Sequence, residues 1–237
     1  MRSFFLKGLL GKAAHAGVFH IQFIDLREFA TDKHHKVDDY PFGEERGMLM
    51  KVDVISRAIR SIDQYEHYRL LYTCPKGKPY TQADALALSN EKGFIILCGY
   101  YEGIDERLFE LFAIESFSVG DTVLSSGESP ALIMAESVIR LLPGVVGKQA
   151  CVKEDSIVSG LLEYPHYTLP REFEGKQVPE IVLSGHHRQM ALWRRKESIR
   201  RTLLDRPELL IENEFDATDR TELTRILKEE TDATPHT

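Results

Sequence analysis

The feature that most constrains the fold is Phe94–Cys98, an uninterrupted apolar run that ends at Gly99. Such a run without polar alternation is typical of a strand in a parallel sheet, because helices cover both faces of that strand. Further strands are predicted at Tyr68–Tyr72 and in the region Glu115–Leu124. Helical segments are expected between them, so the sequence predicts an α/β fold with a mainly parallel sheet.

Helices are predicted from their start and stop signals. Thr81 and Asp84 resemble a capping box, in which two side chains satisfy backbone N–H groups at a helix start. Ser129 and Pro130 are expected as the N-cap and first residue of a later helix. An additional strand is predicted at 18–25, where apolar and polar residues alternate. The predicted helices are Gly8–Ala16, Val52–Tyr65, Thr81–Asn90, Glu106–Phe112 and Ala131–Leu142.

Each strand of the predicted sheet runs into a segment rich in small residues. These are the predicted turn 74–77, the segment 99–103 and the segment 125–128. Ligands of such folds bind beyond the carboxyl ends of the strands. We therefore expect the three loops to form a ligand pocket. The ordinary alternative is that their glycines only allow the chain to turn between a strand and a helix.

The character of the chain changes after Gly147. Residues 161–185 are rich in turn formers, and they are followed by a basic amphipathic helix predicted at Gln189–Leu204 and a charged helix at Ala217–Glu230. We predict a main domain at 1–149, a linker at 150–160 and a small helical C-terminal domain at 161–237.

The chain is acidic, with a net charge of −7 and a pI of about 5.7. Segment 188–206 is nevertheless basic, since seven Arg and Lys residues face two acidic ones, a balance of 7 − 2 = +5. A local basic patch can hold nucleic-acid phosphates on an acidic protein. The alternative is a solvated charged face. The residues expected to contact RNA are Arg188, Arg194, Arg195, Lys196, Arg200 and Arg201.

Several classes of protein are disfavoured. The three cysteines form no CxxC pair, which argues against a disulfide framework or a zinc ribbon. The adjacent histidine pairs lack the spacing of metal ligands, so no metal site is predicted. No GxGxxG follows a strand, which disfavours a nucleotide-binding oxidoreductase. No apolar run approaches the roughly 20 residues of a membrane span, and a cytoplasmic protein is expected.

Five strings closely resemble signature segments of the bacterial tRNA (guanine-N1)-methyltransferases. They follow one another in the order and at the spacing of that family, and together they extend over most of the chain. A single string is modest support, but the ordered set is specific. The strings are 97–107, 118–128, 140–147, 160–168 and 178–187.

This resemblance implies properties that spacing alone does not show. The fold is expected to contain a deep trefoil knot of the SPOUT type, and the protein is expected to be a homodimer with a shared active site that acts on tRNA. S-adenosyl-L-methionine is the implied methyl donor, and Mg²⁺ bound with the RNA is a further suggestion. By resemblance, the donor pocket is lined by Pro75, Gly77, Gly99, Glu102, Val119, Gly120, Asp121, Thr122, Val123, Leu124, Gly127 and Pro130.

The reaction of this family sets the chemistry required of the site. Guanine N1 carries a hydrogen, so a base must remove it, while a cation must stabilise the charge that develops on O6. The resemblance places the base at Asp155 and the cation at Arg140. Without it, Asp155 is equally well a helix N-cap and Arg140 a residue that compensates a helix dipole.

The chain departs from the family at its start, because it begins at the first expected helix. The strand that usually precedes this helix is expected either to lie before the given start or to be missing. A missing strand would favour an alternative function, in which the protein is an RNA-binding relative of the same fold with impaired catalysis.

Overall fold

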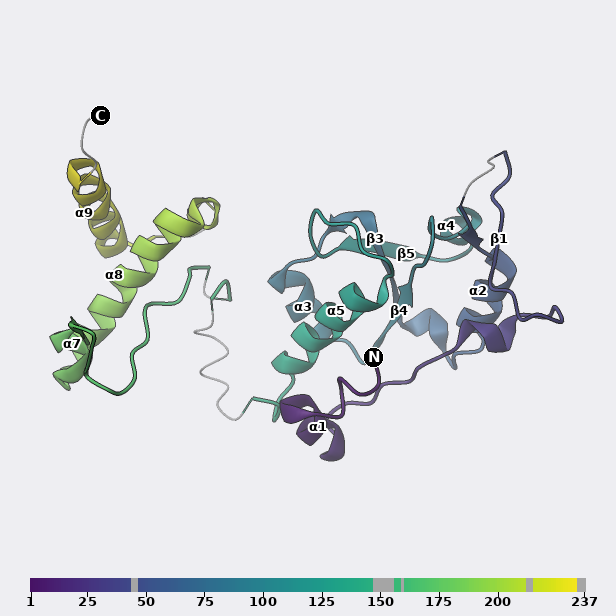
Figure 1. Cartoon of the computed structure of the whole chain (residues 1–237), viewed down its shortest axis with the longest axis horizontal. Coiled ribbons are helices and arrows are strands. Elements are labelled where there is room, and N and C mark those ends of the chain that lie inside the picture. The colour runs from purple at the N-terminus through teal and green to yellow at the C-terminus, as the bar shows by residue number, and fades with distance from the viewer. Residues whose placement is uncertain (44–46, 147–155, 159, 212–214, 234–237) are drawn as a thin grey trace. The chain divides into compact units, whose positions relative to one another are not determined.

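A computed structural model describes the chain at residues 1–43, 47–146, 156–158, 160–211 and 215–233 (Figure 1). The chain divides into two compact units, Met1–Gly147 and Lys148–Thr237. The first unit holds the parallel sheet and the second is mainly helical. We describe each unit by itself.

The first unit is built on three parallel strands, β3 (Arg69–Pro79), β4 (Phe94–Cys98) and β5 (Ile114–Ser118). The longest strand, β3, lies in the centre, in the order β4-β3-β5. Leu71 of β3 pairs with Ile96 on one side and with Glu115 on the other. The α/β class and the parallel pairing predicted from the sequence are therefore confirmed.

Helices cover both faces of this sheet (Figure 1). Successive side chains of a strand point to opposite faces. Leu71 packs with helices α3 (Gln82–Ser89) and α5 (Glu128–Leu141) on one face. Tyr72 packs on the other face with α2 (Val52–Arg60) and α4 (Arg107–Leu111). Burial on both faces explains why β4 is an unbroken apolar run.

The strand predicted at 18–25 is wrong. This segment follows α1 (Gly8–His15) and leads into a short 3-10 helix, η1 (Leu26–Phe29), and it pairs with no strand in the described part of the chain. Its apolar residues instead pack against side chains of α1 and α5. An alternating pattern thus marked a half-buried extended segment, because burial of every second side chain does not require a hydrogen-bonded neighbour.

Residues 31–47 contain one half of a small hairpin. Strands β1 (Asp38–Asp39) and β2 (Leu49–Met50) pair in antiparallel fashion. The next helix, α2, ends at Arg60, earlier than predicted, and a 3-10 turn η2 (Tyr65–His67) follows. Gln64 adopts a left-handed backbone with φ 53°.

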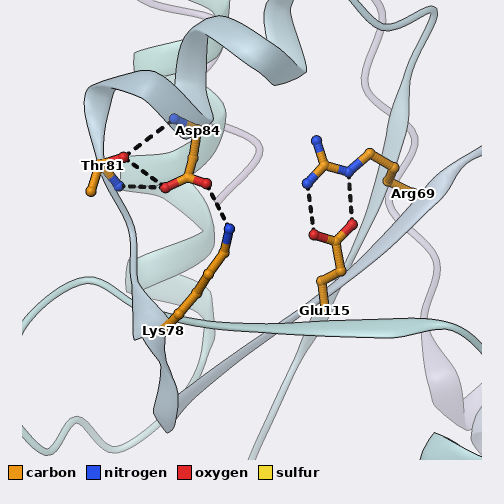
Figure 2. Close-up of polar contacts among 5 residues, drawn as sticks. All are labelled: Arg69, Lys78, Thr81, Asp84 and Glu115. Carbon is orange, nitrogen blue, oxygen red and sulfur yellow. Dashed lines mark hydrogen bonds and ion pairs between the residues drawn. The ribbon is translucent and has the colours of Figure 1, made fainter.

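Residues 74–77, predicted as a turn, lie within the bounds of β3, but Thr73 and Lys78 both pair with Phe117 of β5, so the chain between them leaves the strand pairing. Figure 2 shows the polar contacts around this irregular end. Lys78 Nζ lies 2.8 Å from Asp84 Oδ1, and Asp84 forms the predicted capping box with Thr81. At the other end of β3, Arg69 makes two hydrogen bonds of 2.7 Å to Glu115.

Helix α5 begins two residues earlier than predicted. Its N-cap is Gly127, and not Ser129. The reason is tertiary, since the Gly127 N–H is committed to the carbonyl oxygen of Gly99 at 2.7 Å, which fixes the point at which the helix starts.

The second unit packs two long helices, α8 (His187–Asp205) and α9 (Ala217–Ala233), as predicted. Its core contains Leu161, Ile199 and Ile226. Shorter elements complete it: strands β6 (Glu172–Phe173) and β7 (Lys176–Gln177), helix α7 (Glu180–Leu183) and the 3-10 helix η3 (Pro207–Leu210). Among the helices that the structure describes, none combines the length and the apolar composition needed to cross a membrane.

An ion pair with a buried carboxylate joins α8 to α9 and predicts a pH-dependent stability. Asp219 is 7% exposed and accepts two hydrogen bonds from Arg195, at 2.9 and 2.6 Å. These bonds hold the pKa of Asp219 below its usual value. A carboxyl group with a depressed folded-state pKa stabilises the fold above its unfolded pKa, and that contribution is lost as pH falls through the folded pKa. Asp219→Asn is therefore expected to destabilise this unit at pH 7 by about 1 kcal/mol.

Thermal unfolding followed by circular dichroism at pH 7 and pH 3 measures this effect. The difference between wild type and Asp219→Asn should shrink at the lower pH, because the wild-type carboxylate becomes protonated there. The exposed Asp205, changed to Asn, is the matched control and should leave the unfolding temperature unchanged. An equal difference at both pH values would contradict the assignment.

Candidate active site

A cavity of about 360 Å³ lies at the carboxyl ends of the three parallel strands. Its walls come from residues 74–76 of β3, from the loop 99–104 after β4, and from the segment 116–127 that ends β5 and leads to α5. The structure therefore brings together three segments that are far apart in the sequence. This is the edge of an α/β sheet at which ligands bind.

Nine of the twelve residues predicted for the donor pocket line this cavity, and three do not. Val123 points into solvent with 88% of its surface exposed. Gly77 lies where β3 crosses close to β5, and a Cβ there would be 2.4 Å from the Phe117 backbone nitrogen, so this glycine serves strand packing. Asp121 is the third residue outside the lining. The nine that line it are Pro75, Gly99, Glu102, Val119, Gly120, Thr122, Leu124, Gly127 and Pro130.

The three segments are tied together around Gly127. Thr73 Oγ1 donates to the Gly127 carbonyl oxygen at 3.0 Å, and the Gly127 N–H donates to Gly99 at 2.7 Å. A Cβ on Gly127 would lie 2.1 Å from Thr73 Oγ1 and 2.6 Å from the Gly99 nitrogen. Only glycine allows this approach. Thr73 was missed by the sequence analysis, although a polar residue that closes an apolar strand is a usable signal.

The floor of the cavity contains a tyrosine that was also missed. Tyr72 is buried, and burial raises the pKa of its hydroxyl to about 12. The hydroxyl is therefore protonated at neutral pH and can donate a hydrogen bond. A Cβ on Gly99 would lie 2.9 Å from the Tyr72 oxygen, and one on Gly103 3.2 Å from it. These two glycines leave the hydroxyl room beside the loop.

The loop after β4 is held in place by the hairpin β1–β2. The backbone nitrogen of Glu102 donates to Met48 at 3.1 Å, and that of Met50 donates to Gly103 at 3.0 Å. Tyr101 has a left-handed backbone, with φ 54°, which is uncommon for a residue other than glycine. A hydrogen bond with Asp38 raises the pKa of Tyr101. The hairpin thus stabilises an otherwise unfavourable loop conformation at the rim of the cavity.

The two predicted catalytic residues are not seen together. Arg140 lies in the last turn of α5, is exposed, and is not part of the cavity lining. Asp155 lies outside the described residues. The structure thus gives the position of the proposed cation but not its relation to the proposed base.

The basic residues predicted to contact RNA fall into two groups on α8. Arg195 pairs with Asp219, while Lys196 and Arg200 pair with Glu229 of α9. Arg188 and Arg201 are exposed, and the Arg194 guanidinium lies 4.7 Å from the centre of the Tyr164 ring. Within the described ranges, no carboxylate is in ion-pair distance of Arg188, Arg194 or Arg201. Half of the predicted set therefore also serves the packing of α8 on α9.

The fold and cavity place the chain among α/β proteins that hold a small ligand at the carboxyl edge of a parallel sheet. The sequence profile of the family described as tRNA (Guanine-1)-methyltransferase TrmD matches residues 1–212. The chain therefore belongs to the tRNA (guanine-1)-methyltransferase family, and the resemblance noted in its sequence is confirmed.

Individual relatives agree with this assignment, and each is named tRNA (guanine-N(1)-)-methyltransferase. The protein of Pelotomaculum thermopropionicum is 43% identical over 95% of this chain and 89% of its own length. That of Geobacillus kaustophilus is 46% identical, with 90% and 87% covered. That of Mesorhizobium japonicum is also 46% identical, with 85% and 88% covered. The alternative of a catalytically impaired relative finds no support among them.

Proposed function

We propose that this protein transfers a methyl group from S-adenosyl-L-methionine to N1 of guanosine 37 in tRNA, next to the anticodon. Membership of the methyltransferase family over residues 1–212 carries this proposal. In this view residues 1–149 hold the donor, 150–160 link the domains, and 161–237 bind tRNA. A tRNA substrate implies that the enzyme works in the cytoplasm.

The cavity at the sheet edge suits the proposed donor. Its volume of about 360 Å³ lies within the range of roughly 300–1,000 Å³ common for small-ligand sites. The loop 99–104 and the segment 116–127 bring backbone to the cavity, where N–H and C=O groups can bond an adenine edge, and Pro75 and Leu124 supply apolar walls. The donor would bring an activated methyl group carried on a sulfonium.

The chain's own residues must prepare the acceptor nitrogen. Asp155, as proposed base, takes the proton from guanine N1, which frees the lone pair that receives the methyl group. Arg140 offsets the negative charge that develops on O6. The positions of both residues in the family pattern support these roles.

We propose further that the enzyme is a homodimer whose active site combines Arg140 of one subunit with Asp155 of the other. Apolar side chains of the first unit are exposed in a single chain, among them Leu124 of the cavity lining at 47% and Ile133 of α5 at 50%. Their burial by a second copy would be favourable. The family resemblance also supports a knotted passage of the chain, and the tight fit of Gly127 against Gly99 is compatible with it.

Mixing two inactive variants tests the shared site. Arg140→Ala and Asp155→Ala are each expected to be inactive. In a heterodimer of the two, one shared site lacks both groups and the other retains both. The isolated heterodimer should then have about half the activity of the wild-type dimer, because one of its two sites is complete.

The subunits are co-expressed with two different tags, the heterodimer is isolated, and methyl transfer is measured. Homodimers of each variant purified in the same way are the controls. If the heterodimer is as inactive as both controls, the two groups belong to one subunit and the shared site is wrong.

The tRNA proposal predicts a reduced salt dependence when exposed arginines are neutralised. Arg188→Gln/Arg201→Gln is expected to weaken tRNA binding and to lower the slope of log K against log salt by about 2, one for each lost phosphate contact. Titrations at several salt concentrations measure the slope. Arg225→Gln on α9, which removes one arginine paired with Glu222, is the control for loss of a positive charge elsewhere on the same unit. An unchanged slope would exclude these two arginines from the interface.

The decisive experiment is a methyl-transfer assay with labelled donor and an unmodified tRNA that carries guanosines at positions 36 and 37. A tRNA with adenosine at position 37 is the control. Label at N1 of guanosine 37 is the expected result. Intact donor binding without transfer to that position would refute the proposed function.

A further inference from the structure

A second, smaller cavity lies in the C-terminal unit, distant in the sequence from the residues of the sheet edge. It has a volume of about 110 Å³, close to a third of the first cavity. A space of this size accepts one ring system and not a complete donor molecule. Its lining includes four aromatic or imidazole rings, one thioether and one guanidinium: Tyr164, His166, Tyr167, Trp193, Met190 and Arg194.

Part of this lining is a group of flat side chains in mutual contact. The Tyr164 ring lies 4.6 Å from the His166 ring, and the Arg194 guanidinium lies 4.7 Å from the centre of the Tyr164 ring. His166 Nε2 is in turn 3.3 Å from Glu163 Oε1. These contacts hold the groups in place relative to one another. Tyr167 is 44% exposed and Trp193 half-buried, so rings of the lining remain accessible.

The arginines on the helix face that lines the cavity indicate which kind of ligand it can bind. Met190, Arg194, Glu197 and Arg201 follow the spacing of one helix face on α8. This face differs from the one whose basic residues pair with α9. Aromatic rings and an arginine plane bind nucleobases by stacking, while neighbouring arginines hold phosphates.

We infer that this cavity binds one unpaired nucleobase of the tRNA substrate, outside the guanosine that is methylated. The inference rests on the proposed function, because it assigns the ligand to the same tRNA. Stacking needs a base that has left its helix, so the cavity would distinguish the anticodon loop from paired RNA. Arg201 is positioned on the same helix face to contact the adjoining phosphate.

Binding of the full-length protein to two RNA probes tests this inference. One probe is a stem–loop with the anticodon sequence, and the other is a fully paired duplex of the same stem. Tyr167→Leu and Trp193→Leu keep an apolar side chain but remove the ring. Each is expected to weaken stem–loop binding on the order of tenfold, with duplex binding unchanged. Tyr167→Phe retains the ring and should bind as wild type.

Phe173→Leu is the matched control, since Phe173 is an aromatic residue of the same unit, 65% exposed and outside the cavity. Equal losses for both RNAs, or reduced thermal stability with both affinities unchanged, would overturn the inference and assign the rings to general contact or packing. Donor binding and methyl transfer are measured separately. A wild-type protein that prefers the stem–loop but transfers no methyl group would refute the proposed function and leave the nucleobase site standing.

Discussion

Asp155→Asn is expected to lower the rate of methyl transfer by on the order of 10²–10⁴-fold, the usual contribution of a positioned general base. The amide has nearly the shape of the carboxylate but cannot accept the N1 proton at neutral pH. A guanine N1 that keeps its proton has no lone pair to offer, so no other part of the site can replace this function. Donor binding should remain at its wild-type level.

Single-turnover kinetics with saturating tRNA and donor measure the loss, because they separate chemistry from binding. Glu154→Gln is the matched control, since it removes the adjacent carboxylate of the same segment. A near-normal rate for Asp155→Asn, or an equal loss for Glu154→Gln, would show that Asp155 is not the base.

Gly127→Ala is expected to damage the donor pocket without touching either proposed catalytic residue. The new Cβ would meet the Gly99 backbone nitrogen at 2.6 Å and Thr73 Oγ1 at 2.1 Å. Because a backbone atom cannot turn away as a flexible side chain does, the loops must separate. Overpacking of this kind costs about 1–3 kcal/mol. Separation also breaks the 2.7 Å bond from Gly127 to Gly99, so donor affinity should fall at least about tenfold.

Thermal unfolding and calorimetric titration with the demethylated donor, S-adenosylhomocysteine, measure the two effects. Gly93→Ala is the control, since a Cβ there meets only the Tyr68 side chain at 3.1 Å, immediately before β4. Removing the threonine hydroxyl as well, in Gly127→Ala/Thr73→Ala, should not restore binding because the contact with Gly99 remains. Wild-type donor affinity in Gly127→Ala would mean that this loop does not shape the donor site.

Local signals predicted the elements whose formation depends on local physics. The apolar run of β4 and the capping box of Thr81 and Asp84 are confirmed because burial and capping act over a few residues. The strand at 18–25 failed because a strand needs a hydrogen-bonded neighbour, and alternation reports burial alone. The N-cap at Ser129 failed because Gly127 is held by Gly99, a residue far away in the sequence.

The candidate site could also be predicted only in part. The glycine-rich segments after the strands were predicted to meet, and the cavity at the sheet edge contains nine of the twelve residues proposed for it. The distinct tasks of Gly77 and Gly127 were not predictable, since both are small residues near strand ends. Only the neighbours of the two glycines distinguish their roles. Gly77 packs against Phe117 of β5, whereas Gly127 packs against Thr73 and Gly99 where the loops meet.

The sequence by itself determined the α/β class, the family and the kinds of residue available for methyl transfer, because periodicity, turn chemistry and ordered motifs are written along the chain. The tertiary structure decided which of those residues meet. It brought Thr73, Gly99 and Gly127 into one contact, and it committed Arg195 to Asp219 while leaving Arg201 exposed. The physical reason is that hydrogen bonds, ion pairs and steric fit act over a few ångströms in space, and sequence separation does not report such distances.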